Sequence, residues 1–242
     1  MLSISPAVLA ELAPGGVLRA AINFGNPVLA QQNSEGAPQG VSVALAKALA
    51  AELGVALEMI TFDAAGKVFA ALEEGGWNLA FLAIEPVREE QIAFSKPYVI
   101  IEGTYLVKQD SPFNDVADLD QPGLRLAVGK GAAYDLFLSR SLKHATLERA
   151  ATSSAAVDLY IEQQFDAAAG VRQPLEQIAL KDPGYRVLPG AFTEIRQAMA
   201  VPRGKTSASA YVADFVERQL ASAFVRGALL ASGQTDVSAS LS

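Results

Sequence analysis

Two charged side chains, Glu85 and Arg88, follow the apolar segment 77–83 in the short loop IEPVREE. We expect that segment to be a buried strand, and ligands of open α/β sheets bind beyond the carboxyl ends of strands. An arginine placed there can hold a carboxylate or phosphate with two parallel hydrogen bonds. The alternative is a surface arginine paired with Glu85, Glu89 or Glu90, and the spacing alone leaves both interpretations open.

The carboxyl group of Glu85 could also form an acid/base pair with its neighbour. A nearby cation lowers the pKa of a carboxyl group and makes it a poor proton shuttle, so a structural or ligand-orienting pair is favoured. A second cation, Arg172, follows the segment 165–171 and occupies the same topological place as Arg88. If the two halves of the chain face each other, both arginines border one cleft; the alternative is a solvent-exposed Arg172.

The segment Gly129-Lys130-Gly131-Ala132-Ala133-Tyr134 lies between a predicted strand and a predicted helix. It is similar to half of a dinucleotide fingerprint, but tyrosine replaces the third glycine. We therefore expect no nucleotide and no other cofactor. The interpretation that we favour is an anion site built from backbone N–H groups at a helix N-terminus, at Gly131, Ala132 and Ala133.

Composition excludes several classes of function. The chain has 242 residues, 51% hydrophobic and 19% charged, with a net charge of -7, which does not favour nucleic acid or an anionic membrane surface. It has no cysteine, so thiolate catalysis, disulfides and cysteine-ligated zinc are excluded, and its one histidine, His144, is interpreted as a loop or helix-end cation. We expect no bound metal and no membrane insertion. The N-terminus lacks the basic start and apolar core of a secretory signal, which predicts a cytoplasmic protein if Met1 is the natural start.

Strands and helices alternate along the sequence, which predicts an α/β fold with parallel sheets and right-handed crossovers. In the first half we expect strands at 17–24, 56–62 and 77–83, with helices at 41–54 and 67–76. In the second half we expect strands at 102–108, 124–128, 145–149 and 165–171, a helix after the glycine turn and another capped by Ser153 or Ser154. A single helix is predicted over 207–231. The segments 102–108 and 196–202 are the candidates for strands that cross between the two halves.

Three stretches resemble extracellular solute-binding protein family 3, the polar amino acid-binding components of ABC importers. They are GVSVALAKALAAELGV, FAALEEGGWNLAF and PVREEQIAFSKPY, the last matching the family pattern R-x-x-x-V-x-F-S-x-P-Y. The resemblance covers about 17–233. It implies the type II periplasmic-binding fold, two Rossmann-like α/β lobes joined by two crossing strands with a ligand cleft between them. Lobe 1 would comprise 1–102 and 197–242, and lobe 2 would comprise 103–196.

The resemblance assigns the ligand α-carboxylate to Arg88, but other positions of the family site differ. The family usually has a small or polar residue seven places before this arginine, Ser or Thr five places before it and Thr three places before it; here these positions are Phe81, Ala83 and Glu85. In the first loop, an acidic residue aligns with Asn23 and an aromatic residue with Asn26, and Phe24 between them is a further candidate contact. In lobe 2, a Ser/Thr pair aligns with Ala132 and Ala133.

The acid that binds the ligand α-ammonium in the family aligns with Val171, and a hydrophobic residue cannot offset an ammonium. This departure suggests a carboxylate ligand with an apolar or anionic remainder, with Arg172 meeting a second negative group. The rival hypothesis is that Glu85 takes over the ammonium.

The resemblance also implies a transport permease as partner, a monomer and a periplasmic location. Two other functions stay open: a cytoplasmic or sensory solute-binding protein without transport, and an enzyme similar to cyclohexadienyl dehydratases, for which Glu85 is the only cleft carboxylate that we can nominate.

Overall fold

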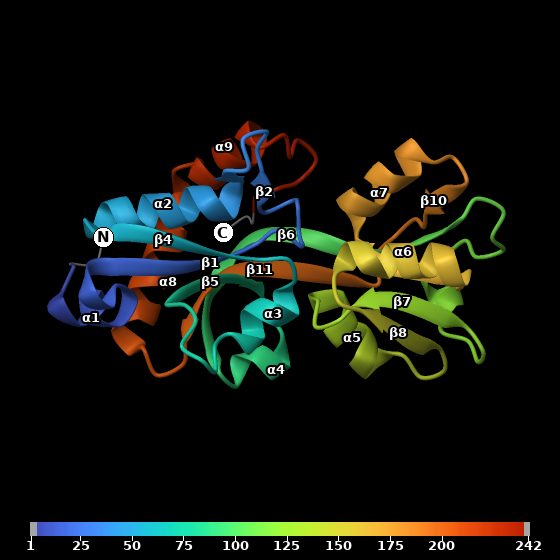
Figure 1. Cartoon of the computed structure of the whole chain (residues 1–242), viewed down its shortest axis with the longest axis horizontal. Coiled ribbons are helices and arrows are strands. Elements are labelled where there is room, and N and C mark those ends of the chain that lie inside the picture. The colour runs from blue at the N-terminus through green and yellow to red at the C-terminus, as the bar shows by residue number, and fades with distance from the viewer. Residues whose placement is uncertain (1–3, 240–242) are drawn as a thin grey trace. The chain divides into compact units, whose positions relative to one another are not determined.

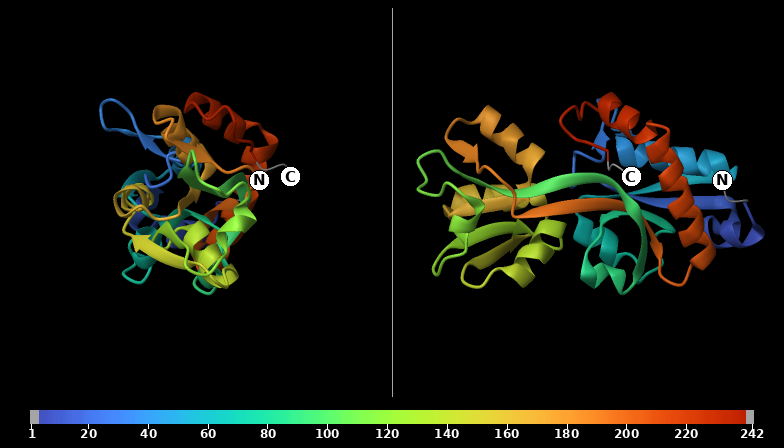
Figure 2. Two further views of the ribbon diagram at one scale, coloured as in Figure 1. Left: turned by 90° about the vertical axis from the view of Figure 1, so that its right-hand side faces the viewer. Right: turned by 180° about the vertical axis from the view of Figure 1, so that it is seen from behind.

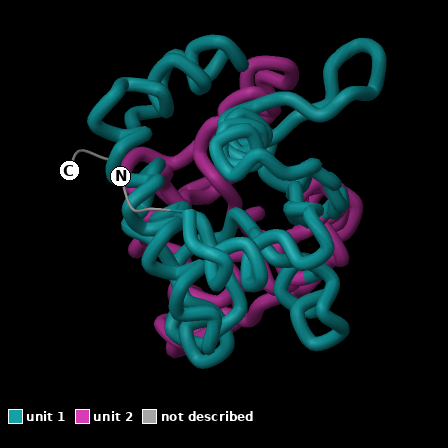
Figure 3. The backbone as a smooth tube through the Cα atoms, turned by 90° about the vertical axis from the view of Figure 1, so that its left-hand side faces the viewer, with its two compact units in different colours: residues 1–63, 67–100, 196–242 teal, residues 64–66, 101–195 magenta. Residues whose placement is uncertain are grey.

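The computed structural model describes residues 4–239, and its contacts divide the chain into two compact units (Figure 3). Unit 1 comprises Met1–Asp63, Lys67–Ile100 and Arg196–Ser242, and unit 2 comprises Ala64–Gly66 and Ile101–Ile195. Two strands contain residues of both units, β6 (Ile92–Lys108) and β11 (Thr193–Pro202), and they are neighbours in the sheet (Figure 1). The predicted mixed α/β architecture with two crossing strands is confirmed.

The sheet of unit 1 is built around β1 (Val17–Asn23), which lies between β4 (Ala56–Phe62) and β5 (Leu79–Ala83). Both pairings are parallel, with Val17 opposite Ala56 and Ala21 opposite Ala80, as the strand–helix alternation predicts. All residues of β5 are buried, and β11 pairs with its other edge. Parallel pairing brings the carboxyl ends of β1 and β5 to the same edge of the sheet.

Helix α2 (Val41–Leu53) packs along β1 and β4 and ends at Gly54, whose φ of 68° is the left-handed conformation expected at such a C-terminus (Figure 1). The remaining helices of the unit are α1 (Pro6–Leu12), α4 (Pro86–Glu89), α8 (Thr206–Ala221), α9 (Phe224–Ala231) and the greater part of α3 (Ala65–Ala70). A short 3-10 turn, η1 (Pro14–Gly16), precedes β1, and β2 (Gln31–Gln32) pairs with β3 (Pro38–Gln39).

Two helix predictions in unit 1 are wrong in extent. The segment 207–231 forms two helices instead of one, because Ala223 has a φ of 59° that interrupts the helical hydrogen bonding between α8 and α9. Apolar spacing continues across this break, so periodicity alone did not reveal it. Helix α3 ends at Ala70, not at the predicted residue 76, and turns follow it.

An ion-pair network joins α2 to α8 in unit 1. The guanidinium of Arg218 donates to both carboxylate oxygens of Glu52 at 2.6 and 2.9 Å and to Asp214 at 2.8 Å, and the Tyr211 hydroxyl donates to Glu52 at 2.5 Å. The three α8 residues are spaced three and four positions apart and so share one face of the helix. Figure 2 shows α8 from behind as the long orange-red helix. Hydrogen bonds from Arg218 are the main cause that lowers the pKa of Glu52.

The sheet of unit 2 is centred on β7 (Arg125–Gly129), which pairs in parallel with β8 (Thr146–Ala150) and β9 (Ala167–Val171). Strand β6 runs antiparallel to β9 and also pairs with β10 (Tyr185–Val187). Helices α5 (Ala133–Ser141), α6 (Ser153–Gln163) and α7 (Arg172–Lys181) pack on this sheet, and η2 (Val116–Leu119) lies between β6 and β7. A core of aliphatic and aromatic residues joins them: Leu106, Ala127, Ala156, Val157, Tyr160, Phe165, Ala168 and Leu175.

Three details of unit 2 and its connections differ from the sequence predictions. Helix α6 is capped by Thr152, whose hydroxyl accepts the N–H of Ala155, and not by Ser153 or Ser154. Strand β6 begins at Ile92, ten residues before the predicted start, because the family motif itself is extended backbone. Helix α7 was not predicted; its sequence is mainly polar and shows only a narrow apolar face.

Within residues 4–239, no helix has the length and apolar character needed to cross a membrane. The same residues contain no group of three or more His, Asp or Glu side chains arranged to hold a metal ion.

Replacing Glu52 by Gln should lower the stability of the protein by about 1–2 kcal/mol at pH 7, since a two-pronged ion pair between helices is lost. Folding lowers the pKa of this carboxyl group, so its contribution to stability is present above pH 4.5, the ordinary pKa value. This contribution disappears as the pH falls below 4.5 and through the lowered pKa. Thermal unfolding at pH 7 and at low pH measures the difference. Glu35→Gln, in an exposed loop, is the control; equal effects of the two substitutions at pH 7 would contradict the assignment.

Candidate functional site

Several predicted site residues gather at the carboxyl edge of the unit 1 sheet. Asn23 ends β1, and its side-chain oxygen accepts the N–H of Gly25 at 2.9 Å. The side-chain oxygen of Asn26 accepts the N–H of Val28 at 3.3 Å. Gly25 lies so close to the end of β4 that a Cβ atom would stand 2.4 Å from the carbonyl oxygen of Asp63. Asn23 and Asn26 therefore shape this loop, and Phe24 lies half-buried between them.

Arg88 lies beyond the carboxyl end of β5, in the single turn of α4, which begins with Pro86 after Glu85. It is 1% exposed, and its Nη1 donates to the carbonyl oxygen of Ala83 at 2.9 Å. Burial lowers the pKa of Arg88 to about 10, and the charge of Glu85 acts in the opposite direction. The guanidinium remains charged at neutral pH. The alternative of a solvent-exposed surface arginine is wrong.

Glu85 is also buried, at 6% exposure, whereas Glu89 and Glu90 are exposed. The backbone carbonyl of Glu85 accepts the N–H groups of Arg88 and Glu89 at 2.9 and 3.1 Å, which closes the turn. A short helical turn between the two side chains thus fixes their separation, and both charges lie in a poorly hydrated environment.

Phe81 and Ala83 are buried residues of β5. The Phe81 ring meets the Tyr98 ring edge-on, with centroids 6.1 Å apart, and the Tyr98 hydroxyl lies 3.2 Å from the Ser42 hydroxyl. Ser95 accepts the backbone N–H of Met199 at 3.1 Å. The F-S-x-P-Y part of the motif therefore packs strands and helices of unit 1 together, which accounts for its restricted residue types.

In unit 2, the loop before α5 uses its own N–H groups. Gly129 donates to the Tyr134 hydroxyl at 3.2 Å, Lys130 to the carbonyl of Ala150 at 2.8 Å, Gly131 to Asp135 at 2.8 Å, and Ala132 to the carbonyl of Gly129 at 3.1 Å. A Cβ on Gly129 would come within 2.8 Å of the Tyr134 hydroxyl. Tyr134, the residue that breaks the dinucleotide pattern, thus fills the space beside Gly129. Of the predicted anion site, Gly131 and Ala132 thus already donate to protein acceptors, and the N–H groups from Ala133 onward remain as candidates.

Arg172 begins α7 directly after Val171, the last residue of β9. Its Nε donates to Glu102 at 2.5 Å, Nη1 to the carbonyl of Leu188 at 3.4 Å, and Nη2 to the carbonyl of Gly190. Glu102 belongs to β6, while Leu188 and Gly190 precede β11. The guanidinium therefore joins β6 and the start of α7 to the connection between β10 and β11, and its contacts support a structural role.

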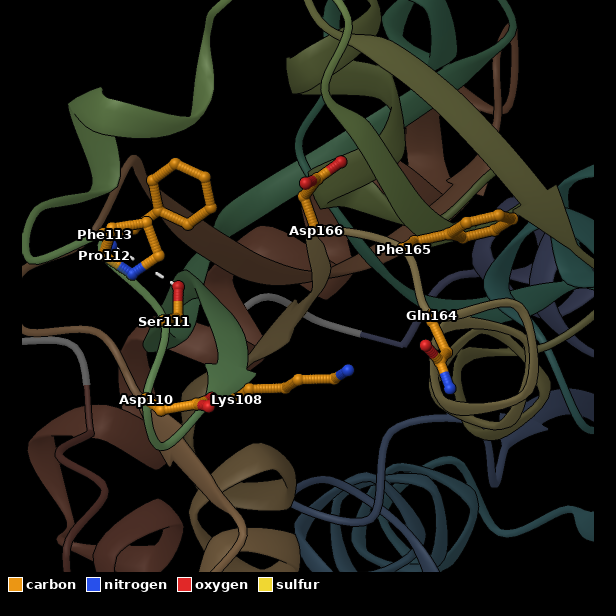
Figure 4. A pocket seen from close by; sticks show the side chains of 8 residues that line it. All are labelled: Lys108, Asp110, Ser111, Pro112, Phe113, Gln164, Phe165 and Asp166. Carbon is orange, nitrogen blue, oxygen red and sulfur yellow. Dashed lines mark hydrogen bonds between the residues drawn. The ribbon is translucent and has the colours of Figure 1, made fainter.

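An open hollow with a volume of about 260 Å³ lies in unit 2 between the end of β6 and the end of α6 (Figure 4). Its lining side chains are Lys108, Asp110, Ser111, Pro112, Phe113, Gln164, Phe165 and Asp166. Asp166 accepts the N–H of Arg125 at 2.7 Å, and the Arg125 guanidinium lies over the Phe165 ring at 4.2 Å. None of the predicted site residues lines this hollow, and two of its side chains support β7.

One family model matches residues 18–226, which is most of the chain. The chain belongs to the bacterial extracellular solute-binding proteins, family 3. A search of curated proteins found no match. Several solved structures match over nearly the whole chain at low sequence identity.

An amino acid ABC transporter substrate-binding protein from Streptococcus pneumoniae, bound to L-arginine, has a TM-score of 0.79 at 21% identity, covering 98% of this chain and 100% of that one. The cysteine-binding protein from Campylobacter jejuni has a TM-score of 0.80 at 20% identity, covering 93% and 92%. An ancestral amino acid-binding protein, described as a precursor of cyclohexadienyl dehydratase, has a TM-score of 0.75 at 23% identity, covering 90% and 96%. These likenesses show the type II fold for this family 3 protein.

Sequence reasoning missed two residues of this family 3 protein that shape the unit 2 loop. Asp135 and Arg149 form an ion pair at 3.0 Å beside Gly131. Asp135 stands four residues after Gly131, a spacing that brings a carboxylate back to the start of a helix, and this was the signal available in the sequence. Arg149 gave no signal, since it comes from a different strand.

Replacing Arg172 by Ala should destabilise the protein by about 1–2 kcal/mol without any solute, because Glu102 and two carbonyl groups lose their donor. A double-mutant cycle with Glu102→Ala separates the pair from the remaining contacts, and we expect a coupling of about 0.5–1 kcal/mol in urea unfolding. Strict additivity of the two substitutions would show that the ion pair contributes nothing.

Proposed function

We propose that this protein is the substrate-binding component of an ABC-type importer and binds a small amino acid-like solute through Arg88 and Glu85. The observation that carries the proposal is the pair of buried, oppositely charged side chains at the carboxyl end of β5. Membership of family 3 supports the general function, and the pair supports the kind of solute.

Arg88 supplies the carboxylate half of the proposed recognition. A guanidinium that stays charged in a buried place needs an opposite charge nearby, and Glu85 provides one within the protein. The hydrogen bond to the Ala83 carbonyl fixes the plane of the guanidinium, and an arginine held in this way is suited to paired hydrogen bonds with a carboxylate. Ala83 would thus act through its backbone, where the family more often has a hydroxyl side chain.

Glu85 affects which net charge of the solute is favourable at this site. Together, Arg88 and Glu85 have no net charge, so a simple monocarboxylate would add an uncompensated negative charge to a poorly hydrated place. A zwitterion adds none. This balance favours the hypothesis that Glu85 receives the solute ammonium over the hypothesis of an apolar or dianionic acid. Arg172, the arginine suggested for a second negative group of the solute, is already paired with Glu102. This pairing also favours a zwitterion over a dianionic acid.

Asn23, Phe24, Asn26 and Phe81 would complete the unit 1 contacts, and Ala133 the unit 2 contacts, as the resemblance implies. Delivery to a membrane permease and a location outside the cytoplasm are parts of the proposal that rest on the family. Cysteine-binding and arginine-bound proteins among the structural matches support an amino acid-like solute as the class to test first.

Replacing Arg88 by Lys should weaken binding of an amino acid by about 100-fold or more, since a single ammonium cannot form the paired hydrogen bonds of a guanidinium. Calorimetry should be carried out with L-arginine, L-cysteine, L-alanine, L-glutamate and L-phenylalanine. Arg88→Lys retains the buried charge, and unfolding monitored through the single tryptophan, Trp77, verifies that it folds. Unchanged affinity in a folded Arg88→Lys variant would remove Arg88 from the site.

Replacing Glu85 by Gln tests whether Glu85 binds the ammonium group of the solute. Three matched pairs of solutes differ only in the amino group: L-alanine and propionate, L-glutamate and glutarate, L-phenylalanine and 3-phenylpropionate. We expect the wild type to prefer the amino acid of a pair, and Glu85→Gln to reduce that preference at least tenfold, because the buried charge that favours an ammonium is lost. Glu89→Gln, one residue after Arg88 and exposed, is the control. Preference of the wild type for the acids would refute the zwitterion proposal.

A further inference from the structure

The turn before α5 contains a carboxylate of its own. Asp135, whose side chain is 4% exposed, accepts the N–H of Gly131 at 2.8 Å and the Nε of Arg149 at 3.0 Å. We propose that Asp135 is a built-in anion of this turn, and that the Asp135–Arg149 pair positions the loop 129–132 for solute binding. The part that concerns binding rests on the proposed function; the part that concerns the loop does not.

The contacts tie the loop to two separate segments of unit 2, β8 and α5. Arg149 lies in β8, and its Nη2 donates to the Ser139 hydroxyl at 2.8 Å, one turn farther along α5. Ser139 in turn donates to the backbone carbonyl of Asp135 at 2.6 Å. The residue after Arg149, Ala150, accepts the N–H of Lys130. The end of β8 and the first turns of α5 therefore hold the loop from both sides.

The backbone of Gly131 needs such support. Its φ of +73° lies in the left-handed region, which glycine adopts freely in an unfolded chain along with many other conformations. A charged hydrogen bond to its N–H selects one of them. The Asp135 carboxylate is offset by Arg149, and the backbone N–H groups of residues 129–132 already have acceptors within the protein. The backbone of the loop therefore contributes shape to the proposed site.

Backbone amide hydrogen exchange, followed by NMR, tests the assignment without any solute. Replacing Asp135 by Ala should accelerate exchange of the Gly131 amide by about 10- to 100-fold, whereas Asp135→Asn, which retains an oxygen acceptor, should change it less than tenfold. Asp120→Ala is the matched control. Asp120 is another carboxylate of unit 2 that accepts backbone N–H groups, those of Lys143, His144 and Ala145, and its loss should leave Gly131 unchanged.

Formate provides a second, independent measurement. In Asp135→Ala, the Gly131 N–H and the Arg149 guanidinium face the space left by a carboxylate, and added sodium formate should restore slow exchange of Gly131. Sodium chloride at equal ionic strength should not. The amino acid panel is then repeated on each variant, and we expect affinity to fall in Asp135→Ala, to recover with formate and to be largely retained in Asp135→Asn.

Unchanged Gly131 exchange in Asp135→Ala would refute the assignment of Asp135 as the built-in anion. Recovery of slow exchange with chloride as well as with formate would refute it too. Retained affinity in Asp135→Ala despite fast Gly131 exchange would overturn the positioning role. Should no amino acid bind the wild type while the exchange results hold, the proposed function fails and the loop assignment stands. If Asp135→Ala does not fold, the comparison of Asp135→Asn with Asp120→Ala decides. Gly131 amide exchange that is accelerated a hundredfold in both of these variants would refute the proposal.

Discussion

The guanidinium of Arg88 is buried at the carboxyl end of β5 and retains its charge, with a pKa lowered to about 10. Much of unit 1 is arranged around this constraint. A buried charge requires a fixed strand end, a backbone acceptor and an opposite charge nearby, and β5, the Ala83 carbonyl and Glu85 supply them. The antiparallel pairing of β5 with β11 keeps that strand end out of solvent, and the turn of α4 sets the distance between the two charges.

Charged side chains also pair with one another in unit 2: Arg172 with Glu102, Arg149 with Asp135, and Arg125 with Glu148. The N–H groups of the glycine turn are likewise satisfied by protein atoms. We propose that the charged groups of the solute meet Arg88 and Glu85 of unit 1, while unit 2 supplies a preformed surface. Preorganised groups lose less entropy when a solute binds, which is consistent with a protein whose task is capture.

The departures from the family pattern take on a consistent meaning in this structure. Phe81, where the resemblance implies a small or polar residue, packs against Tyr98. Val171 stands where the resemblance implies an acid, and Glu85 is proposed to take over its charge. Tyr134 and Asp135 accept N–H groups of the turn in which the resemblance implies a Ser/Thr pair at Ala132 and Ala133. The same fold thus distributes its polar groups differently without losing Arg88.

The sequence by itself determined the alternation of strands and helices, the two crossing strands and the place of Arg88 at a strand end, because these depend on periodicity and on a local motif. It did not determine that Arg88 is buried, that Arg172 has Glu102 as its partner, or that α8 and α9 are separate helices. It also gave no sign of the pairing between Asp135 and Arg149. Each of these depends on residues far apart in the chain, or on one backbone conformation, and only tertiary packing decides which charges meet and which of them lose their water.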